Sequence, residues 1–466
     1  MKKLLKTITS VVLASSILSG FSPLAAVEAQ DGLPEMTTDE ITLTFAGWEY
    51  IGVKELQAQR FMEKYPNITV EIVEIQQDGY MDQLVNMAAA GNLPDAFWYM
   101  GNVDIAIVNG WFGDMTEYWE NDPDNELVLE TLKDKGYLDG ERKLSAAVSY
   151  QPMTVFLDEA VFERLNQPMP SVDWTYDEMI ELMQTMTVPE QGIYGYNDFS
   201  QIMTYAPIVN TDADGEFGWD GETFDLTGEW ADSMQQQAEY VRTGVHAPYF
   251  DTDEAEAAFG DRLLWAARSG RIAMQLDAWW TKDLFNSQEY IDSGIRFKPY
   301  PVPRGVNAET LHKPAYVDFG GISSATEYPR EAYELLKFMG WGAEGWAVRL
   351  DAREVLMDDN GNMIFPYPNG LPLVNDEALW DRVAAELPQE DYYTNMLEVV
   401  REPIPLSGAV IPGFATWIDE IYFNGEYGNI EHAAYNGEVN PADVAQELTD
   451  LLNEYHQEAL DELFFN

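Results

Sequence analysis

Hydrophobic and polar residues follow a regular pattern through the first third of the chain, after an apolar run at the N-terminus. Short stretches that alternate predict strands, and stretches with apolar residues at helical spacing predict helices. Pro66 and Gly91 end the two expected helices. In chain order, the expected elements are a strand at 41–45, a helix at 54–65, a strand at 68–75, a helix at 80–90 and a strand at 96–99. This order predicts a parallel α/β sheet.

Aromatic and acidic residues follow the strands of this sheet. Trp48, Glu49 and Tyr50 come directly after the first strand, and Tyr99 ends the third. Ligands of such sheets bind beyond the carboxyl ends of the strands. We therefore expect these four residues at a binding edge, although an ordinary surface loop is the alternative for Trp48–Tyr50.

Two stretches of this region, Phe61–Glu71 and Met87–Asp95, resemble family 1 extracellular solute-binding proteins of ABC importers, the group that contains maltose-binding protein. Similar blocks continue along nearly the whole chain, at 173–179, 269–279, 300–303 and 329–338. Asn440-Pro441 supplies a good start for a C-terminal amphipathic helix.

The resemblance implies an α/β fold of two lobes with a ligand cleft between them, joined by crossing strands. We place the crossings near 150–154, 300–304 and 352–356. Lobe one would then comprise residues 40–152 plus 303–352, and lobe two residues 153–302 plus 353–466. Hinge closure around the ligand is carried over from the family.

The resemblance also marks candidate ligand contacts in lobe two and on the first crossing. Trp279 and Trp280 follow a strand-like segment where the family places a stacking tryptophan, and alternation implies that only one of them faces the cleft. Asp277 beside them is either a hydroxyl acceptor or a turn residue. Gln151 stands where the family often has a polar contact.

Four further candidates are placed by the expected lobes. Tyr316 and Asp318 fall on the strand that returns to lobe one. Trp417 matches a region where the family has an aromatic pocket residue, although a tryptophan at helical spacing is commonly a core residue. Arg353, at the third expected crossing, either reaches the ligand or forms a plain salt bridge.

The N-terminal segment predicts export. Three lysines precede an apolar run from Ile8 to Leu18, and Val27-Glu28-Ala29 fits a cleavage site, so residues 1–29 are expected to be a signal peptide. Phe21 stands where a lipoprotein would carry the lipid-accepting cysteine. We therefore expect an exported protein, extracellular or in the cell envelope, without a lipid at this site.

Charge and cysteine content exclude several classes of function. The formal charge is −55, from 81 acidic and 26 basic residues, and this field repels nucleic acid and anionic lipid. The chain has no cysteine, which excludes disulfides, thiol catalysis and cysteine-based zinc sites. We expect a monomer.

Three apparent motifs do not predict a cofactor or metal. Gly340–Gly345 fits a dinucleotide motif but follows a predicted helix instead of a strand. Asn210–Gly215 begins like a calcium loop, but Gly221 occupies position twelve. The four histidines share no ligand spacing. No cofactor is expected.

These observations predict a binding protein that captures a neutral sugar or oligosaccharide for an ABC permease without changing it chemically, and so no enzyme. A secreted glycoside hydrolase with a carboxylate pair is one alternative. A binding protein for a non-sugar solute is the other.

Overall fold

The computed structural model describes residues 32–465 except 49, 76–78, 101, 138–139, 200, 306–312, 357–369 and 407–410. The expected signal peptide, Glu49 and His312 lie outside the described residues. Within them, the first elements form where the pattern predicts. They are β1 (Ile41–Ala46), α1 (Ile51–Lys64), β2 (Ile68–Ile72), α2 (Tyr80–Ala90) and β3 (Ala96–Tyr99).

The end of α2 shows how sequence sets an element boundary. Gly91 has a φ of +71°, and its N–H and that of Asn92 donate to the carbonyls of Ala88 and Met87. Glycine takes this left-handed conformation without steric cost and so ends the helix. The chain then enters β3 through Asp95, whose carboxylate accepts from the N–H and hydroxyl of Thr44 on β1.

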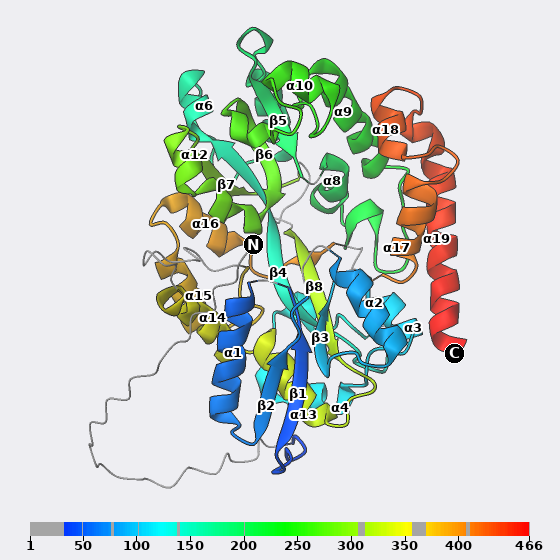
Figure 1. Ribbon diagram of the computed structural model, residues 1–466. Helices are drawn as coiled ribbons and strands as arrows, with labels where there is room; N and C mark the ends of the chain where they lie inside the picture. Colours follow the sequence, from blue (N-terminus) through cyan, green and yellow to red (C-terminus); the bar gives the residue numbers. More distant parts are fainter. Residues whose placement is uncertain are drawn as a thin grey trace, which may run out of the picture.

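Lobe one is the lower half of the molecule in Figure 1 and is built on β1, β2 and β3. These strands are parallel, and β8 (Pro314–Ile322) pairs with β3 in the antiparallel direction. Helix α1 packs against α13 (Pro329–Met339) and α14 (Ala343–Val355). The other helices of this half are α3 (Val103–Val108), α4 (Thr116–Asn121) and α5 (Glu130–Lys133). Helix α15 (Glu377–Glu386) packs against α14, and α16 (Asp391–Val399) packs against β7 (Phe297–Pro301) of the upper half.

Lobe two is the upper half and is built on β5 (Tyr194–Asp198), β6 (Ile272–Ala278) and β7 (Phe297–Pro301). Helix α7 (Tyr176–Thr185) begins with a capping box between Thr175 and Glu178. The helices of this half are α6 (Glu159–Arg164), α7 (Tyr176–Thr185), α8 (Ile202–Asn210), α9 (Glu229–Thr243), α10 (Asp253–Phe259), α11 (Lys282–Phe285), α12 (Gln288–Asp292), α17 (Phe414–Trp417), the π-helix η7 (Ile418–Phe423), α18 (Ile430–Tyr435) and α19 (Pro441–Phe465).

The long strand β4 (Ala146–Asp158) joins the two lobes. Its first half pairs with β8, and its second half pairs with β6 and β7. All thirteen residues are buried. The result is one continuous mixed sheet in the order β2-β1-β3-β8-β4-β6-β5, and β4 is the first expected crossing.

The third crossing, expected near 352–356, is wrong. These residues lie in the last turn of α14 and at its C-cap, and Arg353 ties this helix to Glu386 of α15 at 2.8 Å. The chain meets the crossing strands again at Leu371, whose N–H donates to the carbonyl of Tyr150 on β4, and at β9 (Ile404–Pro405), which pairs with β8. The division of the sequence between the lobes stays a prediction.

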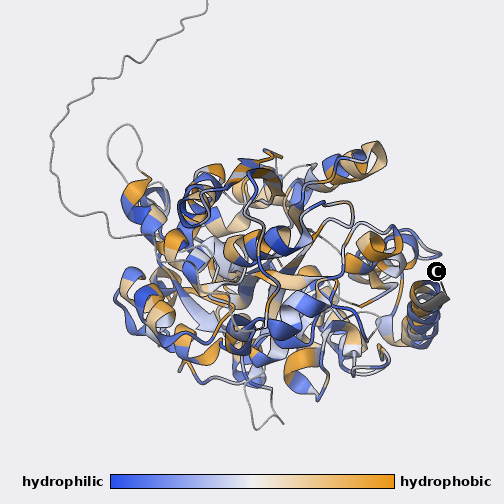
Figure 2. Ribbon diagram, turned by 90° about the horizontal axis from the view of Figure 1, so that it is seen from below, coloured by the Kyte–Doolittle hydropathy of each residue, from blue (hydrophilic) through white to orange (hydrophobic). Residues whose placement is uncertain are grey.

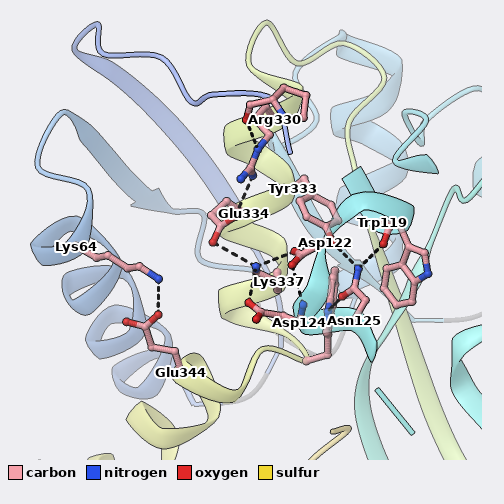
Figure 3. A network of polar contacts seen from close by, with 12 residues as sticks. Lys64, Trp119, Asp122, Asp124, Asn125, Arg330, Tyr333, Glu334, Lys337 and Glu344 are labelled. Atoms are coloured by element: carbon pink, nitrogen blue, oxygen red, sulfur yellow. Dashed lines mark hydrogen bonds and ion pairs between the residues drawn. The ribbon is translucent and has the colours of Figure 1, made fainter. Parts of the chain in front are cut away.

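A buried polar network holds α13 to the segment after α4 (Figure 3). Lys337 contacts Asp122 at 2.8 Å, Asp124 at 3.1 Å and Glu334 at 3.5 Å, and Arg330 pairs with Glu334. Burial acts to raise the pKa of Glu334, but Lys337 and Arg330 outweigh it and the pKa is lowered. Each buried carboxylate of this network therefore has a cationic partner.

The surface helices are amphipathic. Figure 2 shows hydrophilic and hydrophobic segments alternating along the helices at the rim of the molecule. Such alternation lets one side of a helix pack inward while the other is solvated. Among the described residues, none of the helices combines the length and apolarity that a membrane crossing needs.

Candidate functional site

Aromatic side chains gather where β5 and β6 end. These two strands are parallel, so their carboxyl ends meet at one edge. The N–H of Phe199 donates to the carbonyl of Leu276 at 2.9 Å, which holds Phe199 beside the end of β6. Its side chain is 63% exposed, although an aromatic side chain gains most from burial. An exposed ring fixed at this edge is available to a ligand.

The three rings of Phe199, Trp280 and Tyr316 form what is here called the aromatic cluster. The ring centroid of Trp280 lies 4.9 Å from that of Tyr316 and 5.6 Å from that of Phe199. Phe199 and Trp280 stand nearly perpendicular, at 87°. Tyr316 comes from the crossing strand β8, so the cluster joins lobe two to the connection between the lobes. Trp280 and Tyr316 are half-buried.

Asp277 lies at the end of β6 and anchors Trp280. Its carboxylate accepts from the backbone N–H of Ala278 at 2.7 Å and also bonds the side chains of Thr281 and Trp280. Burial raises the pKa of Asp277 to about 6, and these bonds only partly oppose it. Because the indole N–H is the only donor of a tryptophan side chain, this bond sets how the Trp280 ring is turned.

Asp198, at the end of β5, is a second buried carboxylate at this edge. Its Oδ2 accepts from Gln237 at 2.8 Å, and its Oδ1 lies 3.1 Å from Nε2 of His246. The other ring nitrogen of His246 faces the carbonyl of Ala247. The side chains of Asp198 and His246 are enclosed, so this contact is shielded from water.

Glu431, on α18, is a third carboxyl group near this edge. Gln201, next to the start of α8, donates to it at 2.8 Å, and Tyr422 also bonds it. Burial raises its pKa to about 7, and the negative charge of Asp198 adds to the rise. The same charge acts on Asp277. Asp198, Asp277 and Glu431 are here called the acidic trio.

Among the described residues, His246 is the basic side chain that contacts the acidic trio. Within the part of the chain that the structure describes, neither lysine nor arginine pairs with any of the three. Nor do any three acidic or histidine side chains there come together in a way that could hold a metal ion. The trio can accept hydrogen bonds from hydroxyl groups, and it disfavours an anionic ligand.

Five of the predicted site residues are neighbours in this region. Trp280, Tyr316 and Asp277 form or support the aromatic cluster. Gln151 lies directly opposite Tyr316 in the β4–β8 pairing, and Asp318 lies two residues along β8 from Tyr316, opposite Ser149. Because residues two apart on a strand share a face, Tyr316 and Asp318 face the same side of the sheet.

The structure places Trp48 and Tyr99 in the core of lobe one. Trp48 lies edge-on to Tyr80 of α2 and to Trp98, with centroids at 5.4 and 5.1 Å. Tyr99 is buried against Phe112. Both stand at strand ends as expected, but neighbouring rings cover them. Tyr50 is 41% exposed at the start of α1, and its role as a contact stays a prediction.

The Trp279–Trp280 pair separates as the alternation predicts. Trp279 is fully buried and packs against Tyr393 of α16, whereas Trp280 is half-exposed. Trp417 is also fully buried, within the core of lobe two, where Phe217 and Tyr422 pack against its ring. Arg353 forms the ion pair with Glu386 that the sequence left open.

Four residues of this region were not predicted from the sequence: Asp198, Phe199, Gln201 and Glu431. A signal for the first two exists, because Tyr194 and Tyr196 alternate up to Asp198 in a strand-like pattern. The rule that ligands bind beyond the carboxyl ends of strands, here called the strand-end rule, would have found Phe199. Glu431 carries no such signal, since it lies 230 residues after Gln201 on a different helix.

A hollow of about 490 Å³ lies elsewhere, between the turn after α5 and the C-terminal helix. Its walls include Tyr137, Trp219 and His456, and its acidic side chains Asp134, Asp214 and Glu222 are not buried. None of the predicted contacts and no residue of the aromatic cluster lines it. We place the candidate site at the aromatic cluster, because an exposed ring and two half-buried rings lie there beside the buried carboxyl group of Asp277.

A family model for bacterial extracellular solute-binding proteins matches residues 41–340. None of the curated proteins matches the sequence. The matched residues cover well over half of the chain and include the strands β1 to β8 of both lobes.

Solved structures with similar folds come from several bacteria. An ABC substrate-binding protein from Listeria monocytogenes, in complex with cycloalternan, is 17% identical over 89% of this chain and 99% of its own, with a TM-score of 0.65. A cyclic alpha-maltosyl-1,6-maltose binding protein from Arthrobacter globiformis is 14% identical over 90% and 100%, with a TM-score of 0.64. A periplasmic oligogalacturonide binding protein from Yersinia enterocolitica is 16% identical over 90% and 100%, with a TM-score of 0.61. The predicted two-lobed α/β fold is confirmed.

Proposed function

Because this chain belongs to the family of bacterial extracellular solute-binding proteins, we propose that it captures a neutral sugar or oligosaccharide and delivers it unchanged to an ABC permease. Proteins of this family bind solutes and are not enzymes. Several structural neighbours carry saccharides or are named for them. The sugar and the permease are our proposal for this chain.

The observation that carries the proposal is the aromatic cluster above the acidic trio. A sugar presents flat C–H faces and hydroxyl groups, and the cluster offers rings for the first and carboxyl or amide groups for the second. We propose Gln151, Phe199, Gln201, Trp280, Tyr316 and Asp318 as the contact surface. A hydrogen bond to a charged group nets roughly 1.5–3 kcal/mol. Micromolar binding needs about 8 kcal/mol, so a few such bonds with stacking suffice.

The same carboxyl groups would otherwise suggest catalysis, because raised pKa values are common at active sites. Asp277 and Glu431 have pKa values of about 6 and about 7, as a general acid would. In a binding protein these buried groups instead orient Trp280 and Gln201. We expect an oligosaccharide incubated with the protein to be recovered at its original length, and release of reducing ends would contradict this.

The proposed localisation follows from the family, whose proteins are extracellular. We propose that residues 1–29 direct export and are removed, and that the protein works as a monomer. The strong negative charge is compatible with this setting and disfavours nucleic acid as a partner. It also disfavours a sugar phosphate, which would approach against the field.

A thermal-shift panel tests the proposal. It comprises neutral mono- and oligosaccharides, a polyol, a peptide and a sugar phosphate. Ligand at 100 times its dissociation constant adds about 2.7 kcal/mol to the free energy of unfolding. We expect a clear rise in midpoint with at least one neutral sugar, and none with the sugar phosphate. If only the peptide raises the midpoint, the substrate class would be a peptide and not a sugar.

A further inference from the structure

Residues Ile411, Pro412 and Gly413, here called the latch segment, are held from two sides. Helix α19 of lobe two holds one side. The Nδ1 of His456 lies 2.9 Å from the carbonyl oxygen of Pro412 and donates to it. Gly413 has a φ of +79°, and a Cβ there would clash with the backbone oxygen of Tyr455. Ile411 and Phe414 belong to the core of lobe two. The segment is therefore a fixed part of lobe two.

Lobe one holds the other side through the start of α3. Nδ2 of Asn102 donates to the carbonyl of Ile411 at 2.6 Å, and Oδ2 of Asp104 accepts from the N–H of Gly413 at 2.8 Å. Asn102 and Asp104 are only 2% and 7% exposed. Figure 1 shows α3 beside α17 and α19, and α19 contacts α3.

Asn102 and Asp104 are also held in place by hydrogen bonds within lobe one. Oδ1 of Asn102 caps α3 by accepting from the N–H of Asp104, so its Nδ2 points outward. Oδ1 of Asp104 accepts from the N–H of Ile105 at 2.7 Å. Val103 and Ala106 of α3 lie in the core of lobe one. The two bonds thus join two rigid bodies, away from the crossing strands.

We infer that Asn102 and Asp104 are positioning residues whose bonds to the latch segment hold the lobes together and slow the release of a bound ligand. Any opening between the lobes at this side has to break both bonds and exchange them for bonds to water, which costs net free energy. The part concerning release rests on the proposed function. The part concerning the lobes does not.

The ligand-free protein provides the first test. The chain has no cysteine, so Glu117→Cys and Glu254→Cys place one spin label on each lobe. Both positions are exposed. Electron–electron double resonance then measures the distance between lobes in the full chain without any sugar. We expect one narrow distribution for the parent protein.

Asn102→Asp is the decisive variant. Asp caps a helix as well as Asn does, but it places an acceptor against the carbonyl of Ile411 and so breaks the bond to lobe two. We expect the distance distribution to broaden toward longer values, and Asp104→Ala to do the same. Asn109→Asp is the matched control, because Asn109 lies at the other end of α3 and its side chain bonds the carbonyl of Ile105 within lobe one. It should keep the parent distribution.

The second readout is the dissociation constant of the panel sugar with the largest thermal shift. For Asn102→Asp we expect about a tenfold rise, equivalent to about 1.4 kcal/mol, through faster dissociation. Unchanged distances in both Asn102→Asp and Asp104→Ala would overturn the inference, whatever the sugar. Longer distances with an unchanged dissociation rate would overturn its ligand part. If no sugar binds, the proposed function fails while the distances still decide the latch.

Discussion

In lobe one, the buried carboxylates of Asp122 and Glu334 face Lys337 and Arg330, whereas in lobe two the acidic trio faces amides, hydroxyls and the His246 imidazole. The charges of this lobe-one network compensate one another, and the pKa of Glu334 is lowered. In lobe two, burial raises the pKa of Asp277 and Glu431.

Under the proposed function, the difference is one between acids that stabilise the fold and acids that lie beside a binding surface. A compensated network is stable in the folded protein without any bound ligand, because each buried charge already has an opposite charge beside it. The acidic trio is costly without one, because its carboxyl groups lose hydration and gain no cation. Such an arrangement, beside one exposed and two half-buried rings at a strand end, is what the proposed binding surface would need.

Breaking the compensation in lobe one has the largest expected effect. Lys337→Met leaves Asp122 and Glu334 buried without their shared cation. Removing one partner of a buried ion pair costs about 3–5 kcal/mol, which we expect in the free energy of unfolding from urea titration. Arg262→Met is the control, since its pairs with Asp251 and Asp253 are exposed and such pairs contribute about 0–1 kcal/mol. Equal losses in the two variants would contradict the comparison.

Neutralising Glu431 in lobe two should raise the free energy of unfolding, by less than the loss expected for Lys337→Met. The pKa of Glu431 is raised from 4.5 to about 7, so the folded state binds the proton more tightly and stability falls as pH rises across this interval. Glu431→Gln removes that loss, and we expect a gain on the order of 2–3 kcal/mol at pH 8, with little gain at pH 4.5.

Urea titrations at several pH values measure this effect. The parent protein should lose stability between pH 4.5 and 7 more steeply than the variant does. Asp277 adds to the slope between pH 3.8 and about 6 in both proteins. If the free energies of unfolding of parent and variant change in parallel with pH, the pKa of Glu431 is not raised by uncompensated burial.

Removing a ring from the aromatic cluster has the smallest expected effect and acts on binding. Trp280→Ala should weaken binding of the panel sugar by roughly tenfold, because a stacked aromatic contact contributes about 0.5–1.5 kcal/mol beyond its buried area. Phe250→Ala is the control, since Phe250 is an exposed ring of lobe two outside the cluster. Isothermal titration calorimetry measures both. An equal change in the two variants would remove the cluster from the site.

Much of the fold was predictable because its signals are local. Gly91 ends α2 by its own conformational freedom, and Thr175 and Glu178 start α7 through bonds three residues apart. The third crossing was not predictable, because Arg353 is fixed by Glu386, a partner 33 residues away on α15. Whether a segment crosses between lobes depends on such distant contacts.

The site was predictable only in part, for a related reason. The strand-end rule correctly places Trp48 and Tyr99 at strand ends, and it would apply equally to Phe199. Whether a ring there is available depends on the next layer: Tyr80 covers Trp48, and no comparable burial affects Phe199. Trp279 and Trp280 are neighbours in sequence, yet only Trp280 is left partly open.

Strand β4 has a consequence for how this protein can be divided. Residues 146–152 of this buried strand pair with β8, which comes much later in the sequence. A fragment that ends at Pro152 would therefore leave the first half of β4 unpaired, and the remaining fragment would leave β8 without β4. Unpaired strand edges promote aggregation. We therefore expect the two fragments to aggregate when they are expressed separately and to fold when they are mixed. In the intact protein, a protease should cleave β4 more slowly than the turns around it.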